Sequence, residues 1–374
     1  MGGAPAPAGL NVRGAGLVLA LCLLAPLASA ACWPDWEAFK GELVKPDGRV
    51  IDPAQGGIST SEGQAYGLFF ALVANDREGF RRLLGWAENN LAGGDLRKRL
   101  PAWKWGRDGK GSWRVLDDNN ASDADLWMAY ALLEAGRLWA VSEYRVLGEQ
   151  ILWRVAAQTL RPLPGLGLML LPGDRGFVSA RGVRLNPSYL APQLLDRFAA
   201  VAPVWADLAR NGRSLLLASA PHGLAPDWLL WREDGKPAGD PASGTLGSYD
   251  AIRVYLWLGM LDPGAARRDE LLQRYRPMLA LTLARGAPPE KVDIASGKGQ
   301  GQGPAGFSAA LLPLLAALDE KQGLQAQRQR LAQNPPGGYY GRVLVLFGQG
   351  WDQDRYRFDE KGRLMIRWDA ACAD

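Results

Sequence analysis

Amphipathic helical patterns follow one another along almost the whole of this 374-residue chain. Apolar residues recur at the three- and four-residue spacing that forms one face of a helix. This periodicity predicts twelve helices, mostly joined by short connections, at residues 34–44, 63–74, 77–91, 123–139, 142–160, 187–200, 202–219, 248–261, 265–285, 306–318, 320–333 and 338–349. Longer irregular regions remain at 92–120, 161–186 and 221–247. Alternating residues at 167–171 and 176–185 predict two short strands paired as a hairpin.

Twelve consecutive helices suit either an open α-solenoid or a closed double ring of six helical hairpins. No sequence motif repeats at a fixed period, which disfavours the solenoid. No Ser/Gly linker, block of charge or low-complexity run divides the chain. We therefore expect a single domain over residues 32–374. Composition alone does not decide whether the ring closes.

The first 31 residues have the pattern of a secretory signal peptide. Arg13 is the only charge before an apolar run at 17–27, and residues 28–30 (Ala-Ser-Ala) form a small-residue cleavage sequence. The run is too short to span a bilayer. A retained membrane anchor and a lipoprotein are the alternatives. We expect cleavage near Ala30 or Ala31, giving a periplasmic or secreted mature protein with no membrane segment.

Export would place the remaining cysteines in an oxidising compartment. Only Cys32 and Cys372 stay in the mature chain, near its two ends, and they can form one disulfide if the termini meet. The number and spacing of the cysteines suggest no metal site, and the single histidine, His222, excludes His-based zinc clusters. We expect no cofactor. A formal net charge of +4 argues against nucleic acid as the partner.

Three acidic residues stand at predicted helix starts, and the first of them is Asp123. From this residue onward the periodicity predicts a helix, with Ser122 as its N-cap. Asp123 and Asp125 fall in the first turn, where carboxylates interact favourably with the helix dipole. Support of the dipole is therefore the simplest interpretation of both residues.

The second acidic residue is Glu62, within the segment Ser-Thr-Ser-Glu-Gly-Gln-Ala-Tyr-Gly at 59–67. Ser59 or Ser61 is a candidate cap for the helix that follows, and Glu62 could simply support its dipole. The glycines and the neighbouring Tyr66 instead suggest a place where a substrate approaches closely.

The third is Asp250, which stands two residues after a candidate cap, Ser248, and three residues before Arg253. An Asp–Arg pair at this spacing is common on protein surfaces and contributes little to stability. The residues after Arg253 are so apolar that the helix should be buried on all sides. A charged pair at the start of a buried helix is expected to line a cleft.

These segments together resemble glycoside hydrolase family 8, and within it the periplasmic endoglucanases that accompany bacterial cellulose synthases. The residues that match the family signature are Ala121, Ser122, Asp123, Ala124, Asp125, Met128, Ala129, Ala131, Ala135 and Trp139. The segment around Glu62 resembles the family segment that carries the general acid. Further likeness to the cellulose-synthase-associated group lies at 307–313 and 346–351.

The resemblance implies an all-α fold, an (α/α)6 barrel with small β-hairpin insertions near a cleft at one end of the inner helices. It also implies an inverting endo-β-1,4-glucanase that cuts cellulose, with a functional link to the cellulose synthase complex. Glu62 would be the general acid and Asp250 the general base, paired with Arg253. Asp123 would hold the distorted sugar and tune the proton of the acid.

Aromatic residues are the candidates for sugar contacts, because sugars present flat C–H faces to an indole or phenol ring. Trp103, Trp105 and Trp113 fall in the irregular segment 101–120, where they could either stack on sugars or pin a long loop. The resemblance favours Trp103 and implies contacts of Tyr189 near the attacking water and of Tyr249 on the leaving-group side. Tyr66, beside Glu62, and the pair Tyr339 and Tyr340, ahead of the last apolar helix, are further candidates. Eight tryptophans have core-like settings, namely Trp33, Trp36, Trp86, Trp153, Trp205, Trp228, Trp231 and Trp368.

Other functions remain open at this point. Family members also cut chitosan, xylan or mixed-linkage glucan. A glycan-binding protein on an inactive hydrolase fold would ordinarily have lost Glu62 or Asp250, and both are present. A polysaccharide lyase on a similar helical toroid would need a Tyr/His or Arg-rich site. The single histidine and the modest net charge argue against a lyase. We expect a monomer.

Overall fold

The computed structural model describes residues 1–5 and 33–368. The α-helices are α1 (Pro34–Leu43), α2 (Ser61–Val73), α3 (Arg77–Leu91), α4 (Ser122–Leu138), α5 (Ser142–Thr159), α6 (Pro192–Ala199), α7 (Pro203–Ala218), α8 (Ile252–Gly259), α9 (Arg268–Tyr275), α10 (Pro277–Arg285), α11 (Ala305–Ala317), α12 (Lys321–Gln333) and α13 (Gly338–Asp352). The strands are β1 (Ser59–Thr60), β2 (Lys104–Arg107), β3 (Trp113–Asp117), β4 (Leu160–Leu163), β5 (Gly167–Leu170), β6 (Val178–Ser179), β7 (Gly182–Leu185), β8 (Leu229–Trp231), β9 (Pro237–Gly239), β10 (Leu246–Gly247), β11 (Lys291–Asp293), β12 (Lys298–Gln300), β13 (Tyr356–Phe358) and β14 (Leu364–Ile366). Short 3-10 helices lie at Pro53–Gln55 and Pro187–Tyr189.

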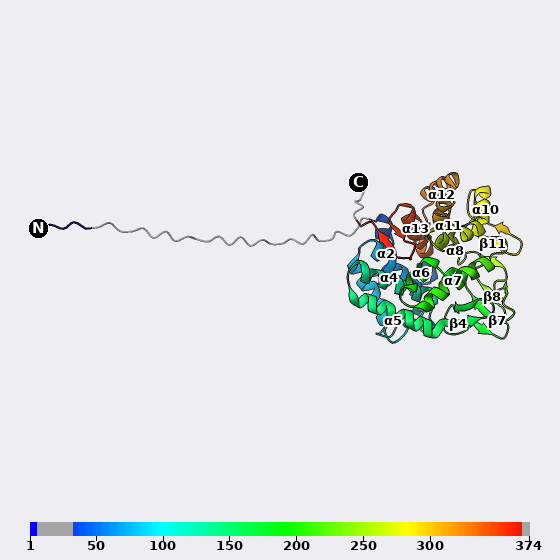
Figure 1. Cartoon of the computed structure of the whole chain (residues 1–374), viewed down its shortest axis with the longest axis horizontal. Coiled ribbons are helices and arrows are strands. Elements are labelled where there is room, and N and C mark those ends of the chain that lie inside the picture. Colours follow the sequence, from blue (N-terminus) through cyan, green and yellow to red (C-terminus); the bar gives the residue numbers. More distant parts are fainter. Residues whose placement is uncertain (6–32, 369–374) are drawn as a thin grey trace.

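Six of these helices form a closed inner ring in the order α2, α4, α6, α8, α11 and α13, each packed on the next. Phe70 of α2 lies against Phe347 of α13, with ring centroids 4.7 Å apart, and this contact closes the ring. The other helices pack outside it, and α5 and α12 mark opposite edges of the molecule (Figure 1). The fold is the (α/α)6 barrel that the family resemblance implies.

Inner helices such as α2 and α8 are buried on every side because both of their faces are covered. All residues of α2 from Gly63 to Val73 are buried, and so is the whole of α8. Outer helices such as α3 keep a polar face toward solvent, as an amphipathic pattern requires. Aromatic rings fill the barrel axis, since Phe347 contacts Tyr66, Trp127 and Trp257 at centroid distances of 5.0 Å.

The helix predictions hold in type and fail at two places where proline or a turn interrupts the chain. The predicted helix 265–285 is two helices, α9 and α10, because Pro277 cannot continue the hydrogen-bond ladder of the helix before it. The predicted helix 187–200 begins as a 3-10 turn and becomes α6 only at Pro192.

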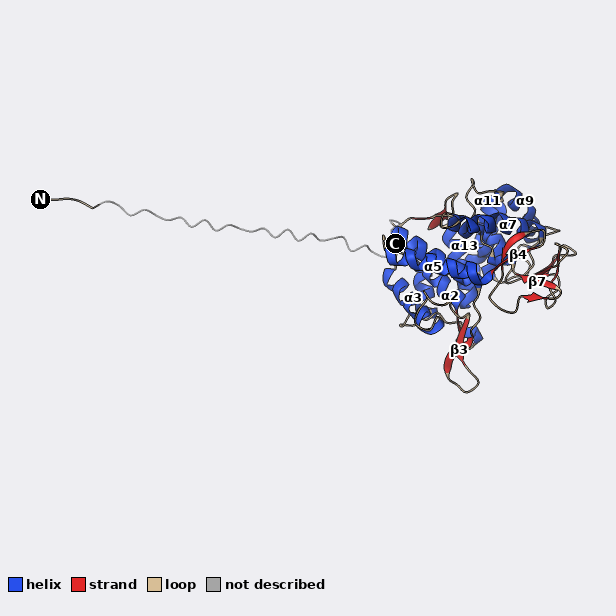
Figure 2. Ribbon diagram, turned by 60° about the horizontal axis from the view of Figure 1, so that its bottom comes forward, coloured by secondary structure: helices blue, strands red, loops and turns tan. Residues whose placement is uncertain are grey.

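The predicted pairing of strands is wrong. The strand at 167–171 corresponds to β5, which pairs with β4 and not with 176–185. The segment 176–185 is itself a hairpin, β6–β7, and β7 continues through β8 to β9 in one sheet. The region 92–120 also contains the hairpin β2–β3, whose first strand pairs with β1. This hairpin projects from the helical body (Figure 2).

The first and last described residues of the domain, Trp33 and Trp368, both lie against α2. The ring of Trp33 packs edge-on to Phe70, and the indole of Trp368 donates a 3.2 Å hydrogen bond to the carbonyl of Leu72. The expected signal peptide and both cysteines of the expected disulfide, Cys32 and Cys372, lie outside the described residues. None of the helices in residues 1–5 and 33–368 is long and apolar enough to cross a membrane.

Candidate active site

A cavity of about 390 Å³ lies at the N-terminal ends of four inner helices, α2, α4, α8 and α13. The side chains and backbone that line it are Val50, Ile51, Asp52, Gln55, Ile58, Thr60, Ser61, Glu62, Gly63, Trp103, Ala121, Asp123, Tyr189, Tyr249, Asp250, Arg253, Tyr339 and Tyr340. The three carboxylates that the sequence singles out therefore share one cavity, although almost 190 residues separate the first from the last.

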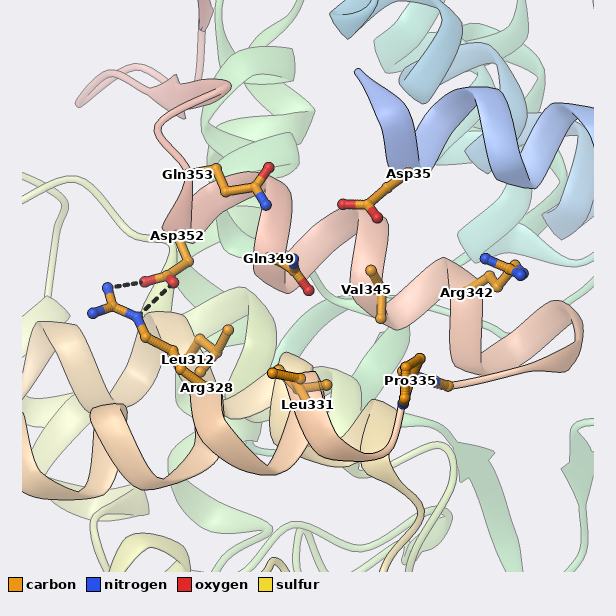
Figure 3. Close-up of a pocket in the computed structure, with 12 residues that line it drawn as sticks. Asp35, Leu312, Arg328, Leu331, Pro335, Arg342, Val345, Gln349, Asp352 and Gln353 are labelled. Carbon is orange, nitrogen blue, oxygen red and sulfur yellow. Dashed lines mark hydrogen bonds and ion pairs between the residues drawn. The ribbon is translucent and has the colours of Figure 1, made fainter. Parts of the chain in front are cut away.

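A second cavity, of about 420 Å³, lies between α12, α13 and the start of α1 (Figure 3). Its walls mix apolar side chains such as Leu331 and Val345 with charged and amide groups, and Arg328 is already paired with Asp352 at 2.7 Å. None of the described residues that line this cavity is aromatic. The cavity at the helix N-termini, which combines carboxylates with aromatic rings, is the better candidate.

Glu62 occupies the first turn of α2. The cap of this helix is Thr60, whose hydroxyl accepts a 3.1 Å hydrogen bond from the amide of Gly63, so the predicted caps Ser59 and Ser61 are wrong. The hydroxyl of Tyr339 donates to Oε1 of Glu62 at 2.9 Å. Arg253 donates to Oε2 at 2.5 Å. Both carboxylate oxygens are thus held, one from the neighbouring helix α13 and the other from α8 across the ring.

Asp123 lies in the first turn of α4, where its side chain is only 6% exposed. Ser122 is not an N-cap as predicted, because it lies inside the helix and donates its hydroxyl hydrogen to the carbonyl of Leu171 at 2.7 Å. Burial raises the pKa of Asp123 to about 7, against the lowering effect of Arg253 and with a further rise from the charge of Glu62.

One oxygen of Asp123, Oδ1, is buried and has no hydrogen-bond partner among the described residues. A buried acceptor that lines a cavity and lacks a donor is suited to a ligand hydroxyl. The neighbouring Asp125 points elsewhere, since it accepts a 2.6 Å hydrogen bond from Asn120 and does not line the cavity.

Arg253 joins the three carboxylates. One terminal nitrogen bonds to Glu62 and lies 3.7 Å from Asp123, and the other donates to Oδ1 of Asp250 at 2.6 Å. The guanidinium side chain is only 4% exposed, and it also donates to the hydroxyls of Tyr66 and Ser188. The predicted pair of Asp250 and Arg253 is confirmed, but Ser248 does not cap the helix, which begins later, at Ile252.

Backbone hydrogen bonds link Trp103 to the two segments that carry Glu62 and Asp123. The amide of Ser61 donates to the carbonyl of Trp103 at 3.0 Å, and the amide of Trp103 donates to the carbonyl of Asn119 at 2.8 Å. Trp103 lines the cavity as a half-buried side chain. Its position is therefore fixed relative to both carboxylates.

The predicted tyrosines are brought together around the same cavity. Tyr189 and Tyr339 line it directly, and Tyr249 lines it with 47% of its surface exposed. Tyr66 lies beneath the cavity, where it is buried and its hydroxyl meets Arg253 at 3.3 Å. Tyr340, at the start of α13, is an additional lining residue.

Trp105 and Trp113 lie on the projecting β2–β3 hairpin and are not among the residues that line the cavity. Their rings stack on each other with centroids 4.9 Å apart and an angle of 13° between the planes. The guanidinium of Arg49 lies 4.9 Å from the first ring and 4.5 Å from the second. This arrangement places them in contact with each other, away from the three carboxylates.

Two tryptophans differ from their predicted core-like settings. Trp153 of α5 is 54% exposed, because it faces outward from the outer layer. Trp228 belongs to the site, since its indole nitrogen donates to Oδ2 of Asp250 at 3.0 Å. The sequence pattern also gave no role to its neighbour Asp227. The signal that could have indicated both residues is an acidic residue next to a tryptophan in an irregular segment.

Among the described residues, no group of three or more His, Cys, Asp or Glu side chains has the arrangement of a metal site. The side chains that line the cavity supply carboxylates, one arginine, hydroxyls and aromatic rings. Two carboxylates from different parts of the ring, with rings that can pack on sugar faces, suit acid–base cleavage of a glycosidic bond.

Comparisons with known proteins agree with this chemistry. The family profile "Glycosyl hydrolases family 8" matches residues 12–354. The Escherichia coli K12 protein named "Endoglucanase" is 48% identical over 369 residues, which cover 98% of this chain and 100% of that protein. The "Endoglucanase" of Xanthomonas axonopodis pv. citri is 50% identical, with 97% of each chain covered.

Solved structures show the same arrangement of helices. The crystal structure of endo-1,4-D-glucanase from Vibrio fischeri ES114 superposes with a TM-score of 0.84 at 42% identity, covering 90% of this chain and 100% of that one. The endo-β-1,4-glucanase CMCax from Acetobacter xylinum gives a TM-score of 0.71 at 28% identity, covering 84% and 95% of the two chains.

Proposed function

Because this chain belongs to glycosyl hydrolases family 8, we propose that it is an endo-β-1,4-glucanase that cuts cellulose chains by a single, inverting displacement. The observation that carries the proposal is the convergence of Glu62, Asp123 and Asp250 on Arg253 in one aromatic-lined cavity. Such a cavity offers an acid, a base and a means of holding a sugar between them.

In this proposal Glu62 gives its proton to the glycosidic oxygen as the bond to the leaving chain breaks. Asp250 takes a proton from the water that attacks the anomeric carbon on the opposite face. No covalent intermediate forms, so a β-linked chain gives the α-anomer first. The water needs room, and an inverting pair has its carboxyl groups roughly 6.5–9.5 Å apart, wider than the ~5–5.5 Å of a retaining pair.

Asp123 supplies two contributions. Its unpartnered Oδ1 accepts a hydrogen bond from a hydroxyl of the sugar at the cleavage point. Burial raises the pKa of Asp123 to about 7, so this carboxyl can hold a proton near neutral pH beside Glu62, the proposed general acid. Arg253 holds Glu62 in the free enzyme, and entry of the glucan loosens that contact so that Glu62 can approach the leaving oxygen.

Rings at the rim of the cavity would hold the glucan chain. Trp103 comes from the segment between α3 and β2, Tyr189 from the 3-10 turn before α6, and Tyr249 from the segment before α8. They come from three different connecting segments at one end of the barrel, which suits binding of several sugar units of a polymer. This arrangement supports internal cleavage.

Proton NMR of freshly cut cellopentaose, read before mutarotation, tests the mechanism. An α-anomer formed first supports the inverting pair, and an initial β-anomer would overturn the role given to Asp250. Incubation of the mature protein with carboxymethyl cellulose, chitosan, xylan and lichenan side by side tests the substrate. Preference for any of the last three would replace the cellulase assignment with that of another glycan hydrolase of the family.

We further propose that the protein is exported, loses residues 1–31, and acts as a monomer on glucan that a cellulose synthase complex produces. The charge and apolar pattern of the first 31 residues supports export. Mass spectrometry of the protein from a periplasmic fraction should give a mature chain beginning near Ala31 or Cys32. A full-length chain in the membrane fraction would contradict export and cleavage, and light scattering checks the monomer.

A further inference from the structure

The carboxylate of Asp250 is held at both of its oxygens. Arg253 donates to Oδ1 at 2.6 Å, and the indole nitrogen of Trp228 donates to Oδ2 at 3.0 Å. The arginine is shared with Glu62 and Asp123, so it does not define the orientation of Asp250 by itself. Trp228 is the only other side chain with a hydrogen bond to this carboxylate in the described part of the chain.

The ring of Trp228 is occupied by protein rather than open to a sugar. The guanidinium of Arg184 lies 4.1 Å from its centroid, and Asp240 holds that guanidinium at 2.5 Å. Phe177 lies parallel to the indole at 6.0 Å, and Tyr189 packs edge-on at 5.9 Å. The ring is also absent from the cavity lining. Its contribution to the site is therefore the N–H group, aimed at Asp250.

The preceding residue, Asp227, fixes the backbone that carries the base. Its Oδ1 accepts hydrogen bonds from the amides of Ser248 at 2.7 Å, Asp250 at 3.0 Å and Ala251 at 2.8 Å. These amides belong to the turn that leads into α8, which begins at Ile252. Close packing supports the contact, since a Cβ on Gly247 would lie 2.0 Å from the carbonyl oxygen of Ala225.

We propose that Asp227 and Trp228 are positioning residues for catalysis, which together fix the backbone and the carboxylate of Asp250 toward the attacking water. The inference rests on the proposed role of Asp250 as the general base. Two adjacent residues thus control both ends of the base, its main chain through Asp227 and its Oδ2 through Trp228. Small displacements of a catalytic group are costly, about 100-fold for 1 Å.

Trp228→Phe keeps the ring and removes the N–H group. We expect kcat on cellopentaose to fall about 10- to 100-fold while KM stays within about twofold, because the sugar contacts are intact. The matched control is Trp231→Phe, which also removes one indole hydrogen bond, to the carbonyl of Pro164 at 3.0 Å, from the same loop region. The control should keep the wild-type kcat, with a similar change in melting temperature.

Asp227→Ala is a second, independent variant, in which the same loss of kcat without a change of KM is expected. Asp250→Asn and the double variant Asp250→Asn, Trp228→Phe complete the set. If Trp228 acts through Asp250, its substitution should lower the residual rate no further once Asp250 is neutral.

The outcomes separate the two proposals. If Asp250→Asn keeps more than a tenth of the wild-type rate, the assignment of the base is wrong and the positioning role falls with it. If Asp250→Asn is inactive but Trp228→Phe and Asp227→Ala both keep the wild-type kcat, Asp250 stays the base and the positioning role alone is overturned. A rise in KM with unchanged kcat would make Trp228 a binding residue and would equally overturn it.

Discussion

Replacing Asp123 with asparagine should remove much of the pH dependence of stability between about pH 4 and 7. In the folded protein, burial raises the pKa of Asp123 from 3.8 to about 7. In the unfolded chain the carboxyl has its ordinary pKa. Between these two values the folded state keeps a proton that the unfolded state has already released, so the free energy of unfolding falls as the pH rises.

The magnitude follows from the separation of the two pKa values. Each pH unit across this window removes about 1.4 kcal/mol, so the whole window removes at most about 4 kcal/mol. The contribution is fully present below pH 3.8 and is lost as the pH rises through about 7. Because the side chain is only 6% exposed, little of this effect is screened by solvent. Asparagine cannot ionise, so the variant should gain stability over the wild type as the pH rises.

Urea unfolding at pH 4.5, 6 and 7.5 measures the effect. Asp269→Asn provides the control, since that side chain is 90% exposed and the chemical change is the same. Asp227, whose pKa burial raises to about 6, contributes in the same direction and remains in both variants. If the free energy of unfolding changes with pH to the same extent in Asp123→Asn and in the wild type, Asp123 does not hold a proton near neutral pH. Its proposed role beside the general acid is then refuted.

Three further outcomes are expected. Glu62→Gln should bind cellopentaose but lose at least about 100-fold in kcat, since the amide cannot donate a proton; retention of a tenth of the wild-type rate on carboxymethyl cellulose would exclude Glu62 as the acid. Trp103→Ala should raise KM for cello-oligosaccharides more than it lowers kcat, as loss of a stacking surface predicts, whereas the exposed Trp153→Ala serves as the control; unchanged KM for every chain length would make Trp103 a packing residue. Cys32 and Cys372 should form one disulfide, which would add up to about 4–5 kcal/mol to the free energy of unfolding in the chain-entropy account. Thiol titration of the unfolded, unreduced mature protein should find no free thiol, and two free thiols per chain would contradict the disulfide.

Much of the helical framework could be predicted from the sequence because it depends on local periodicity. An all-apolar run such as α8 must be buried on every side, and an amphipathic run such as α3 must present one face to solvent. The same local logic places Glu62 and Asp123 in first turns, where carboxylates are favourable. The motifs around these residues then suffice to recognise the family, and with it the closed ring.

Capping and strand pairing were less predictable, since they depend on which donor or acceptor is nearby in space. Ser122 has the chemistry of a cap, yet its hydroxyl donates a hydrogen bond to the carbonyl of Leu171, in a distant part of the chain. The amides of the turn before α8 donate to Asp227, more than twenty residues earlier, and the side chain of Ser248 does not cap the helix. Short strands likewise choose partners by proximity, so β5 pairs with β4.

Only the tertiary structure decides how the active-site charges are combined. Sequence spacing predicts that Arg253 meets Asp250, because the two lie one turn apart, but it gives no hint that the other nitrogen of Arg253 reaches Glu62. It also leaves Trp228 indistinguishable from a core tryptophan, although its N–H group points at Asp250. Local periodicity fixes which face of a helix is buried. The contacts among loops at the ends of the inner helices are set by closure of the ring, which brings together residues that no local pattern connects.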